Sequence, residues 1–60
     1  MIQAVIIDDE PNNISSLQNL LKKFCPTIIV TGTADNAQSG YELIRSVSPQ
    51  LALLDIEMPF

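Results

Sequence analysis

The stretch Leu51–Pro59, with the sequence LALLDIEMP, decides how this chain folds. Four apolar residues run directly into Asp55, and a proline follows four positions later. A run that is apolar on both faces is typical of a central parallel strand that is covered on both sides. Pro59 cannot donate a ladder hydrogen bond, so the strand should end before it. Asp55 then lies at the carboxyl end of the strand, where open α/β sheets place their reactive and ligand-binding residues. The alternative is that Asp55 has no chemical role and only ends the strand.

Two other segments have the composition of buried strands. Residues 4–7 are apolar and mostly β-branched, and they run into three consecutive acids at 8–10. Residues 28–30 form a second short apolar run. Residues 31–34 either continue this strand or form the loop that follows it. Gly32 weakens the prediction of a regular strand in the latter segment.

A helix is predicted between the first two strands. Pro11 suits its first turn, where the missing N–H is harmless, and Pro26 stops it. Apolar residues at spacings of three and four give this helix an amphipathic stripe about three turns long. The stripe consists of Ile14, Leu17, Leu20, Leu21 and Phe24. Cys25 is then expected to be a partly buried residue at the helix end.

A second helix is predicted before the third strand. Asp35 or Asn36 caps its N-terminus, and Asp35 with Gln38 resembles a capping box. Gly40 lies on the inward stripe, where a glycine more often indicates close helix–sheet packing than a hinge. The stripe consists of Ala37, Gly40, Tyr41, Ile44 and Val47.

The order strand, helix, strand, helix, strand predicts an α/β fold. Short apolar strands that alternate with helices form a parallel sheet with right-handed crossovers. Both connections are long enough for such crossovers. With 60 residues, the chain forms one small domain at most.

Composition excludes several function classes. Three basic residues face seven acidic ones, and the net charge of −4 argues against a nucleic-acid surface, which needs clustered Lys and Arg. No apolar run approaches the length of a membrane span, and the N-terminus lacks a signal-peptide pattern. Cys25 is alone, which excludes an intrachain disulfide and suits a reducing cytoplasm. Because the chain has no histidine, it cannot build a His/Cys zinc site, and any metal is bound through oxygen, as Mg²⁺ is.

The carboxylates at the strand ends form the candidate site. If the first and third strands are neighbours, their ends lie about 4.8 Å apart, and Asp8, Asp9 and Asp55 converge on one crevice. Like charges this close are unfavourable unless a proton or a cation bridges them, and Mg²⁺ is the natural cation. A carboxylate beside a bound metal can attack phosphorus and become an aspartyl phosphate. The alternative is that residues 8–10 form only a solvated loop.

These residues also carry a resemblance to a known family. The chain has VIIDDEP at 5–11, GTADNA at 32–37, a glycine at 40 and LDIEMP at 54–59. Together, at this separation, these motifs closely resemble the receiver domain of bacterial two-component response regulators, and the resemblance covers the whole chain.

The resemblance implies a role for each candidate residue. Asp55 is the phosphoacceptor, Asp9 is the direct Mg²⁺ ligand, and Asp8 acts largely through water. Glu57 supplies its backbone carbonyl to the metal, and its side chain borders the site. The implied function is cytoplasmic signalling: a sensor histidine kinase phosphorylates Asp55, and the change switches an output domain. The intact receiver assists its own phosphorylation and dephosphorylation but is not otherwise an enzyme.

A finer resemblance concerns the output domain. Asn36, Ala37 and Gly40, together with LDIEMP, look most like regulators that carry a LytTR-type DNA-binding domain. DNA is therefore expected as a partner only through that missing domain.

The resemblance also implies that residues 1–60 are the N-terminal fragment of a receiver domain. The receiver fold has five β/α units in the flavodoxin-like strand order 2-1-3-4-5, and the chain covers the first half, a three-stranded parallel sheet in the order 2-1-3 with two helices. The hydroxyl residue after strand four and the lysine after strand five are expected outside this chain, so the fragment alone should be inactive. Its third strand is then an exposed apolar edge, through which copies are expected to self-associate.

Two alternatives belong to other classes. A haloacid-dehalogenase-like phosphotransfer enzyme also uses an aspartate after a buried strand. Its D-x-D-x-T/V pattern is not matched here, because Ile56, Glu57, Met58 and Pro59 follow Asp55. The second alternative is a structural self-association module whose acids have no present function.

Overall fold

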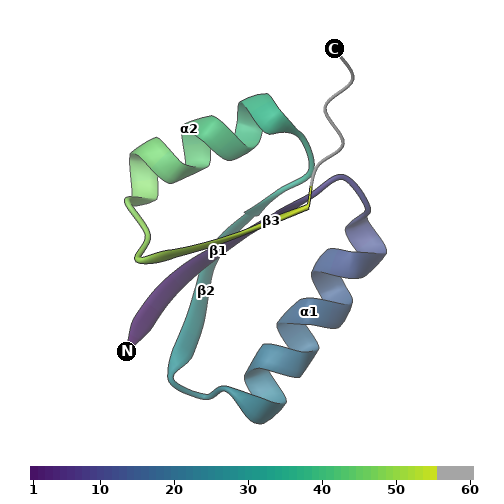
Figure 1. The fold of residues 1–60 in the computed structure, drawn as a ribbon, viewed down its shortest axis with the longest axis vertical. Coiled ribbons are helices and arrows are strands. Elements are labelled where there is room, and N and C mark those ends of the chain that lie inside the picture. The colour runs from purple at the N-terminus through teal and green to yellow at the C-terminus, as the bar shows by residue number, and fades with distance from the viewer. Residues whose placement is uncertain (56–60) are drawn as a thin grey trace.

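A three-stranded parallel sheet with a helix on each face makes up the part of the chain that this computed structural model describes, residues 1–55. The elements follow in the order β1 (Ile2–Asp8), α1 (Pro11–Phe24), β2 (Ile28–Ala34), α2 (Ala37–Val47) and β3 (Leu51–Asp55). The strands lie in the order β2-β1-β3, and both pairs are parallel. Figure 1 shows the sheet running between α2 on one side and α1 on the other. The predicted α/β fold and its 2-1-3 strand order are confirmed.

The centre of the core is β1. Residues 4–7 are at most 2% exposed, because β1 has a strand on each side and both helices pack on it. Successive residues of a strand point to opposite faces of the sheet. Val5 and Ile7 accordingly form one cluster with Ala34 of β2. The side chains of α2 that close over this cluster are Leu43, Ile44 and Val47.

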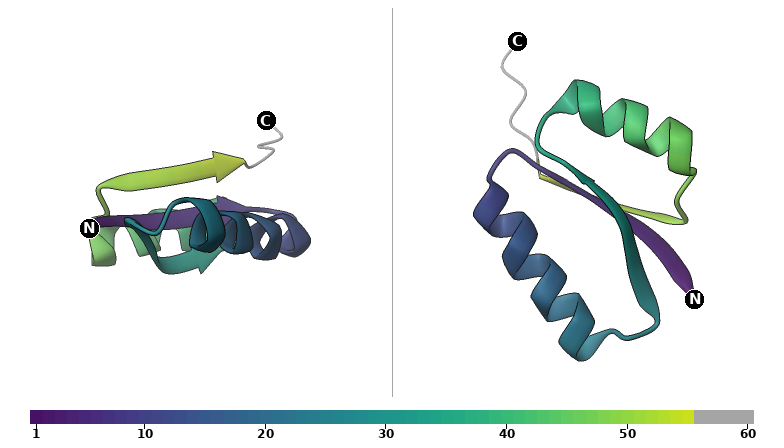
Figure 2. Two further views of the ribbon diagram at one scale, coloured as in Figure 1. Left: turned by 90° about the horizontal axis from the view of Figure 1, so that it is seen from below. Right: turned by 180° about the vertical axis from the view of Figure 1, so that it is seen from behind.

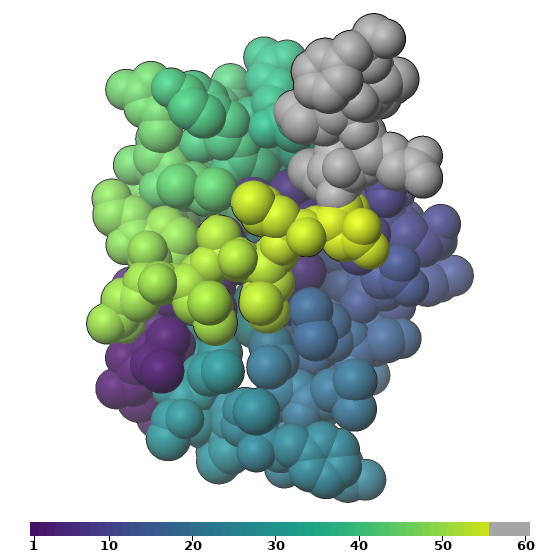
Figure 3. Space-filling view, in the orientation of Figure 1, coloured from purple at the N-terminus to yellow at the C-terminus, as the bar shows by residue number. Residues whose placement is uncertain are grey.

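Within residues 1–55, β3 is an edge strand on which neither helix has its main contacts, which corrects the expectation that LALLD is a central strand covered on both sides. Leu54 is 65% exposed, whereas its register partner Ile7 is 2% exposed. The reason is that both helices pack on β1 and β2, while β3 has its main contacts with β1. Seen from below, β3 lies apart from both helices (Figure 2). In the space-filling view β3, in yellow, crosses the face toward the viewer (Figure 3). The prediction of an exposed apolar edge is confirmed for residues 51–55.

α1 is covered less completely than its sequence pattern indicates. Of the predicted stripe, Ile14, Leu17 and Leu21 are half-buried, but Leu20 is 53% and Phe24 66% exposed. The stripe is wider than the surface that β1 and β2 offer, so one flank and the C-terminal end of the helix remain in solvent. No helix within residues 1–55 is long and apolar enough to cross a membrane.

The ends of the helices agree with the sequence in part. Cys25 is half-buried and caps α1, donating its backbone N–H to the Leu21 carbonyl at 2.8 Å, as its predicted place at the helix end requires. At the start of α2, the side-chain oxygen of Asn36 accepts a hydrogen bond from the Ser39 backbone N–H at 2.8 Å. The predicted capping box of Asp35 with Gln38 is wrong. Asp35 instead accepts a hydrogen bond from the Asn36 side-chain amide at 2.9 Å.

The inward face of α2 differs from the predicted stripe at two positions. Ala37 and Tyr41 are exposed, and Leu43 packs on the core in their place. Gly40 is buried, and a Cβ atom there would lie 2.7 Å from Cγ2 of Ile7. The predicted close helix–sheet packing at Gly40 is therefore confirmed.

β2 continues as a strand through residues 31–34. A shift of register against β1 leaves Thr31 as an extra residue, whose hydroxyl donates to the Ala4 carbonyl at 3.2 Å. At Gly32, a Cβ atom would lie 2.6 Å from Cδ1 of Leu43. This glycine thus permits the close approach of α2 and does not end the strand.

Candidate functional site

The carboxyl ends of β1 and β3 bring two of the predicted site residues together. Asp8 is the last residue of β1, Asp55 is the last residue of β3, and the two are register partners. Adjacent strands lie about 4.8 Å apart. Partners in register also point to the same face of the sheet. The premise of the predicted crevice, that the first and third strands are neighbours, is confirmed.

Asp8 is the buried member of this pair, with 7% of its surface exposed. Its Oδ1 accepts a hydrogen bond from the backbone N–H of Glu10 at 2.8 Å. This short-range bond is an aspartate-type turn that leads the chain out of β1, and Pro11 then begins α1. Because a buried carboxylate without partners is costly, the hydrogen bond both offsets desolvation and fixes the orientation of the side chain.

Asp55 is the exposed member of the pair. A cavity of about 370 Å³ lies between β1, β3 and α1, and both Asp8 and Asp55 line it. Its other lining residues are Ile6, Asn13, Ser16, Leu17, Leu20, Leu53 and Leu54. Most of the wall is therefore apolar, with a few polar groups, a composition typical of small-molecule sites. An exposed carboxylate here can be reached by another molecule.

Sequence reasoning missed two polar residues of this cavity, Asn13 and Ser16 on α1. They are three positions apart, so they lie on one flank of the helix beside Leu17. That spacing was the available signal. The amide and the hydroxyl add hydrogen-bonding groups opposite the carboxylates.

Asp9 does not join the other two acids as closely as predicted. It is exposed in the turn after β1, and within residues 1–55 no three acidic, cysteine or histidine side chains are gathered as a metal-binding group. Glu57 lies outside the described residues. The described donors nevertheless fit Mg²⁺, which is bound by one or two carboxylates and retains several waters. Asp8 and Asp55 place two carboxylates, whose oxygens are of the type that Mg²⁺ prefers, at one edge of the sheet.

The sequence of the chain was compared with protein families and with individual known proteins. The family model described as the response regulator receiver domain matches residues 4–60. The chain is 42% identical to a protein-glutamate methylesterase/protein-glutamine glutaminase of Oleidesulfovibrio alaskensis, over 98% of this chain and 16% of that protein.

Two regulators are similarly close. The transcriptional regulatory protein MctR of Rhizobium johnstonii is 41% identical over 97% of this chain and 27% of its own length. The nitrate/nitrite response regulator protein NarL of Escherichia coli is 40% identical over 92% of this chain and 25% of its own length. The chain thus spans only 16–27% of the length of these curated relatives. No solved structure matches it.

Proposed function

Because the chain belongs to the response regulator receiver domain family, we propose that its Asp55 accepts a phosphoryl group from a sensor histidine kinase. A receiver domain is the phosphoacceptor module of two-component signalling, so a cognate histidine kinase is its partner. The observation that carries the proposal is the pairing of exposed Asp55 with buried Asp8 at the carboxyl edge of the sheet. The exposed carboxylate is the one that a large partner can reach.

The step is an in-line displacement at phosphorus. A carboxylate oxygen of Asp55 forms the new O–P bond while the P–N bond of the kinase's phosphohistidine breaks, and the imidazole that leaves takes up a proton. The hydrogen bond from the Glu10 N–H holds Asp8 in place beside the reacting group. Asn13 and Ser16 line the same cavity, where they can hydrogen-bond phosphoryl oxygens.

Mg²⁺ is the proposed cofactor, and Asp8 and Asp55 are the carboxylates that the described structure supports as its ligands. By resemblance to the family, Asp9 and the backbone carbonyl of Glu57 are proposed as further ligands. When bound, the cation offsets the negative charge that gathers on the transferring phosphoryl group. Asp8 and Asp55 carry like charges on adjacent strands, and this repulsion is what a cation at the site relieves.

Residues 1–60 are proposed to be the N-terminal half of the receiver domain, and an output domain is proposed to follow in the intact protein. The relatives named above include a transcriptional regulatory protein and a methylesterase, so likeness in this segment does not distinguish one output from another. The LytTR-type DNA-binding domain finds no support among them and stays a prediction from the sequence. DNA binding and cytoplasmic location likewise remain proposals for the whole protein.

Phosphorylation of the intact protein with acetyl phosphate and Mg²⁺ tests this function. We expect mass spectrometry to show the addition of one phosphoryl group, and Asp55→Asn to abolish it. Asp35→Asn is the matched control, because Asp35 is an exposed acid that follows β2 at the same edge of the sheet. Modification that persists in Asp55→Asn would overturn the assignment.

The fragment itself is further proposed to self-associate through the edge of β3. The 65% exposure of Leu54 on an open strand favours this. A two-fold antiparallel pairing centred on Leu53 places Asp55 opposite Leu51 of the second copy, which keeps the two Asp55 carboxylates apart.

Sedimentation of the 60-residue chain checks the self-association. We expect dimers at micromolar concentration, and Leu54→Lys should weaken them, since it places a charge on the paired edge. Tyr41→Lys is the control, because Tyr41 is exposed to a similar extent, 62%, but lies on α2. A folded monomer at these concentrations, or equal weakening by both variants, would refute the edge pairing.

A further inference from the structure

The outer edge of β2 is open to solvent. β2 hydrogen-bonds to β1 on one side, and no other strand of residues 1–55 pairs with it. An edge strand presents a row of unpaired N–H and C=O groups to which another extended chain can bond. Any strand that pairs with β3 leaves this edge open, because β2 and β3 lie on opposite sides of β1.

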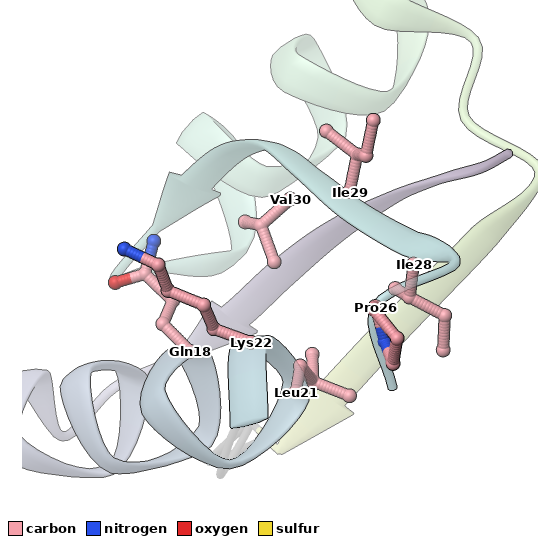
Figure 4. Close-up of a pocket in the computed structure, with 7 residues that line it drawn as sticks. All are labelled: Gln18, Leu21, Lys22, Pro26, Ile28, Ile29 and Val30. Atoms are coloured by element: carbon pink, nitrogen blue, oxygen red, sulfur yellow. The ribbon is translucent and has the colours of Figure 1, made fainter. Parts of the chain in front are cut away.

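A groove of about 380 Å³ runs along this edge, between the last turns of α1 and the start of β2 (Figure 4). Leu21, Pro26 and the strand residues 28–30 give it an apolar floor. Gln18 and Lys22 project from α1 across from Val30 (Figure 4). The groove thus borders three residues of β2, offers a surface for apolar side chains and has a lysine, Lys22, in its lining.

The charge of this groove contrasts with that of the chain. The net charge is −4, but Lys22, one of the three basic residues, lines the groove, and Lys23 follows it in the last turn of α1. Among residues 1–55, no acid lines the groove. The C-terminus of a helix carries about half a negative charge, which is less than the unit charge of Lys22. A basic spot on an acidic surface selects an acidic partner.

We propose that the groove between α1 and the outer edge of β2 binds an extended acidic peptide segment of another protein, which adds to β2 as a further strand. In this mode, main-chain hydrogen bonds supply affinity, and alternate side chains reach the same face. An apolar side chain of the segment occupies the surface formed by Leu21, Ile28 and Val30. A carboxylate of the segment pairs with Lys22.

A second copy of this chain fits the groove less well. Within the described part, most of its acids gather at the carboxyl edge of the sheet or in the adjoining turns, and not in an extended segment that is free to lie beside Lys22. The open edge of β3, where residues 51–54 are all apolar, offers a second copy an alternative. The two edges therefore take different occupants.

Fluorescence anisotropy of the intact protein tests the proposal with a short labelled peptide of repeating Val-Ser-Glu-Ser, in which valine and glutamate share one face of the extended chain. We expect saturable binding that weakens as salt is raised, and no binding of the same peptide with lysine in place of glutamate. Equal binding of the two peptides would show apolar adhesion alone and overturn the charge-selective groove. Absence of binding by the acidic peptide would overturn it as well.

Two lysine variants locate the site. Lys22→Glu should raise the dissociation constant about tenfold, because it replaces an attraction by a like-charge repulsion within the groove. Lys23→Glu carries the same change of charge on the adjacent residue, which does not line the groove, and should raise the constant about twofold at low salt. An equal loss in both variants would indicate only diffuse charge attraction.

Hydrogen–deuterium exchange distinguishes the two edges. Bound peptide should protect amides of residues 28–31 and leave those of residues 51–55 unchanged. Protection at residues 51–55 would place the peptide on β3 and contradict the proposal. These outcomes do not depend on phosphorylation of Asp55, so they stand apart from the test of the receiver function.

Discussion

β1 and β3 are apolar strands that pair in register and yet differ completely in burial. Ile7 and Leu54 face each other across the ladder, but Ile7 is 2% exposed and Leu54 is 65% exposed. Both runs contain four apolar residues before an aspartate, at 4–7 and at 51–54. The difference arises because α2 and β2 cover one strand and not the other. An apolar run therefore predicts a strand, while the elements around it determine whether that strand is core or edge.

The largest expected effect tests this contrast directly. Ile7→Ala should lower the free energy of unfolding by about 2–5 kcal/mol, because it removes buried methyl groups and leaves a cavity under α2. Leu54→Ala should lower it by less than about 0.5 kcal/mol, since its side chain is mostly in water. Urea unfolding followed by circular dichroism measures both. Similar losses in the two variants would mean that β3 is as well packed as β1.

A smaller effect is expected where α2 touches β1. Gly40→Ala places a Cβ 2.7 Å from Cγ2 of Ile7, and that stiff β-branched side chain cannot move away easily. Overpacking of this kind costs about 1–3 kcal/mol, against a gain in helix propensity of up to about 1 kcal/mol. Gln38→Ala, at an exposed position of α2, is the control and should change stability little. A stabilised Gly40→Ala variant would show that α2 does not press on Ile7.

The fold was largely predictable from local pattern, and the errors in helix burial share one cause. The strand at residues 4–7, both helices and Gly40 followed from composition and spacing. Leu20, Phe24 and Tyr41 were assigned to buried stripes but are more than half exposed. Periodicity shows which face of a helix is apolar, but not how much surface the neighbouring strands offer to cover it.

The smallest expected effect lies at the start of α2. Asn36→Ala removes the side chain that accepts from the Ser39 N–H and should cost about 1 kcal/mol. Asp35→Ala should cost less, because the Asp35 side chain bonds only to Asn36 and to no described backbone group of the helix. The same urea titration separates the two. A larger loss in Asp35→Ala would restore the predicted capping box.

The two carboxylates of the candidate site could be predicted from the sequence, but most of the residues that surround them could not. Asp8 and Asp55 end apolar strands, so a parallel sheet brings them to one edge, as observed. Asp9 follows the strand, where no pattern fixes the direction of a turn residue. Asn13 and Ser16 were missed because polar residues on a helix flank do not reveal whether they face solvent or a cavity.

The most direct test is to trap the acyl phosphate of the intact protein with borohydride, which reduces an aspartyl phosphate to homoserine, and to locate homoserine by peptide mass spectrometry. We expect homoserine at position 55 alone, after treatment with acetyl phosphate and in an Mg²⁺-dependent manner. Homoserine at Asp9, or none at position 55, would contradict the assignment of Asp55 as the phosphoacceptor.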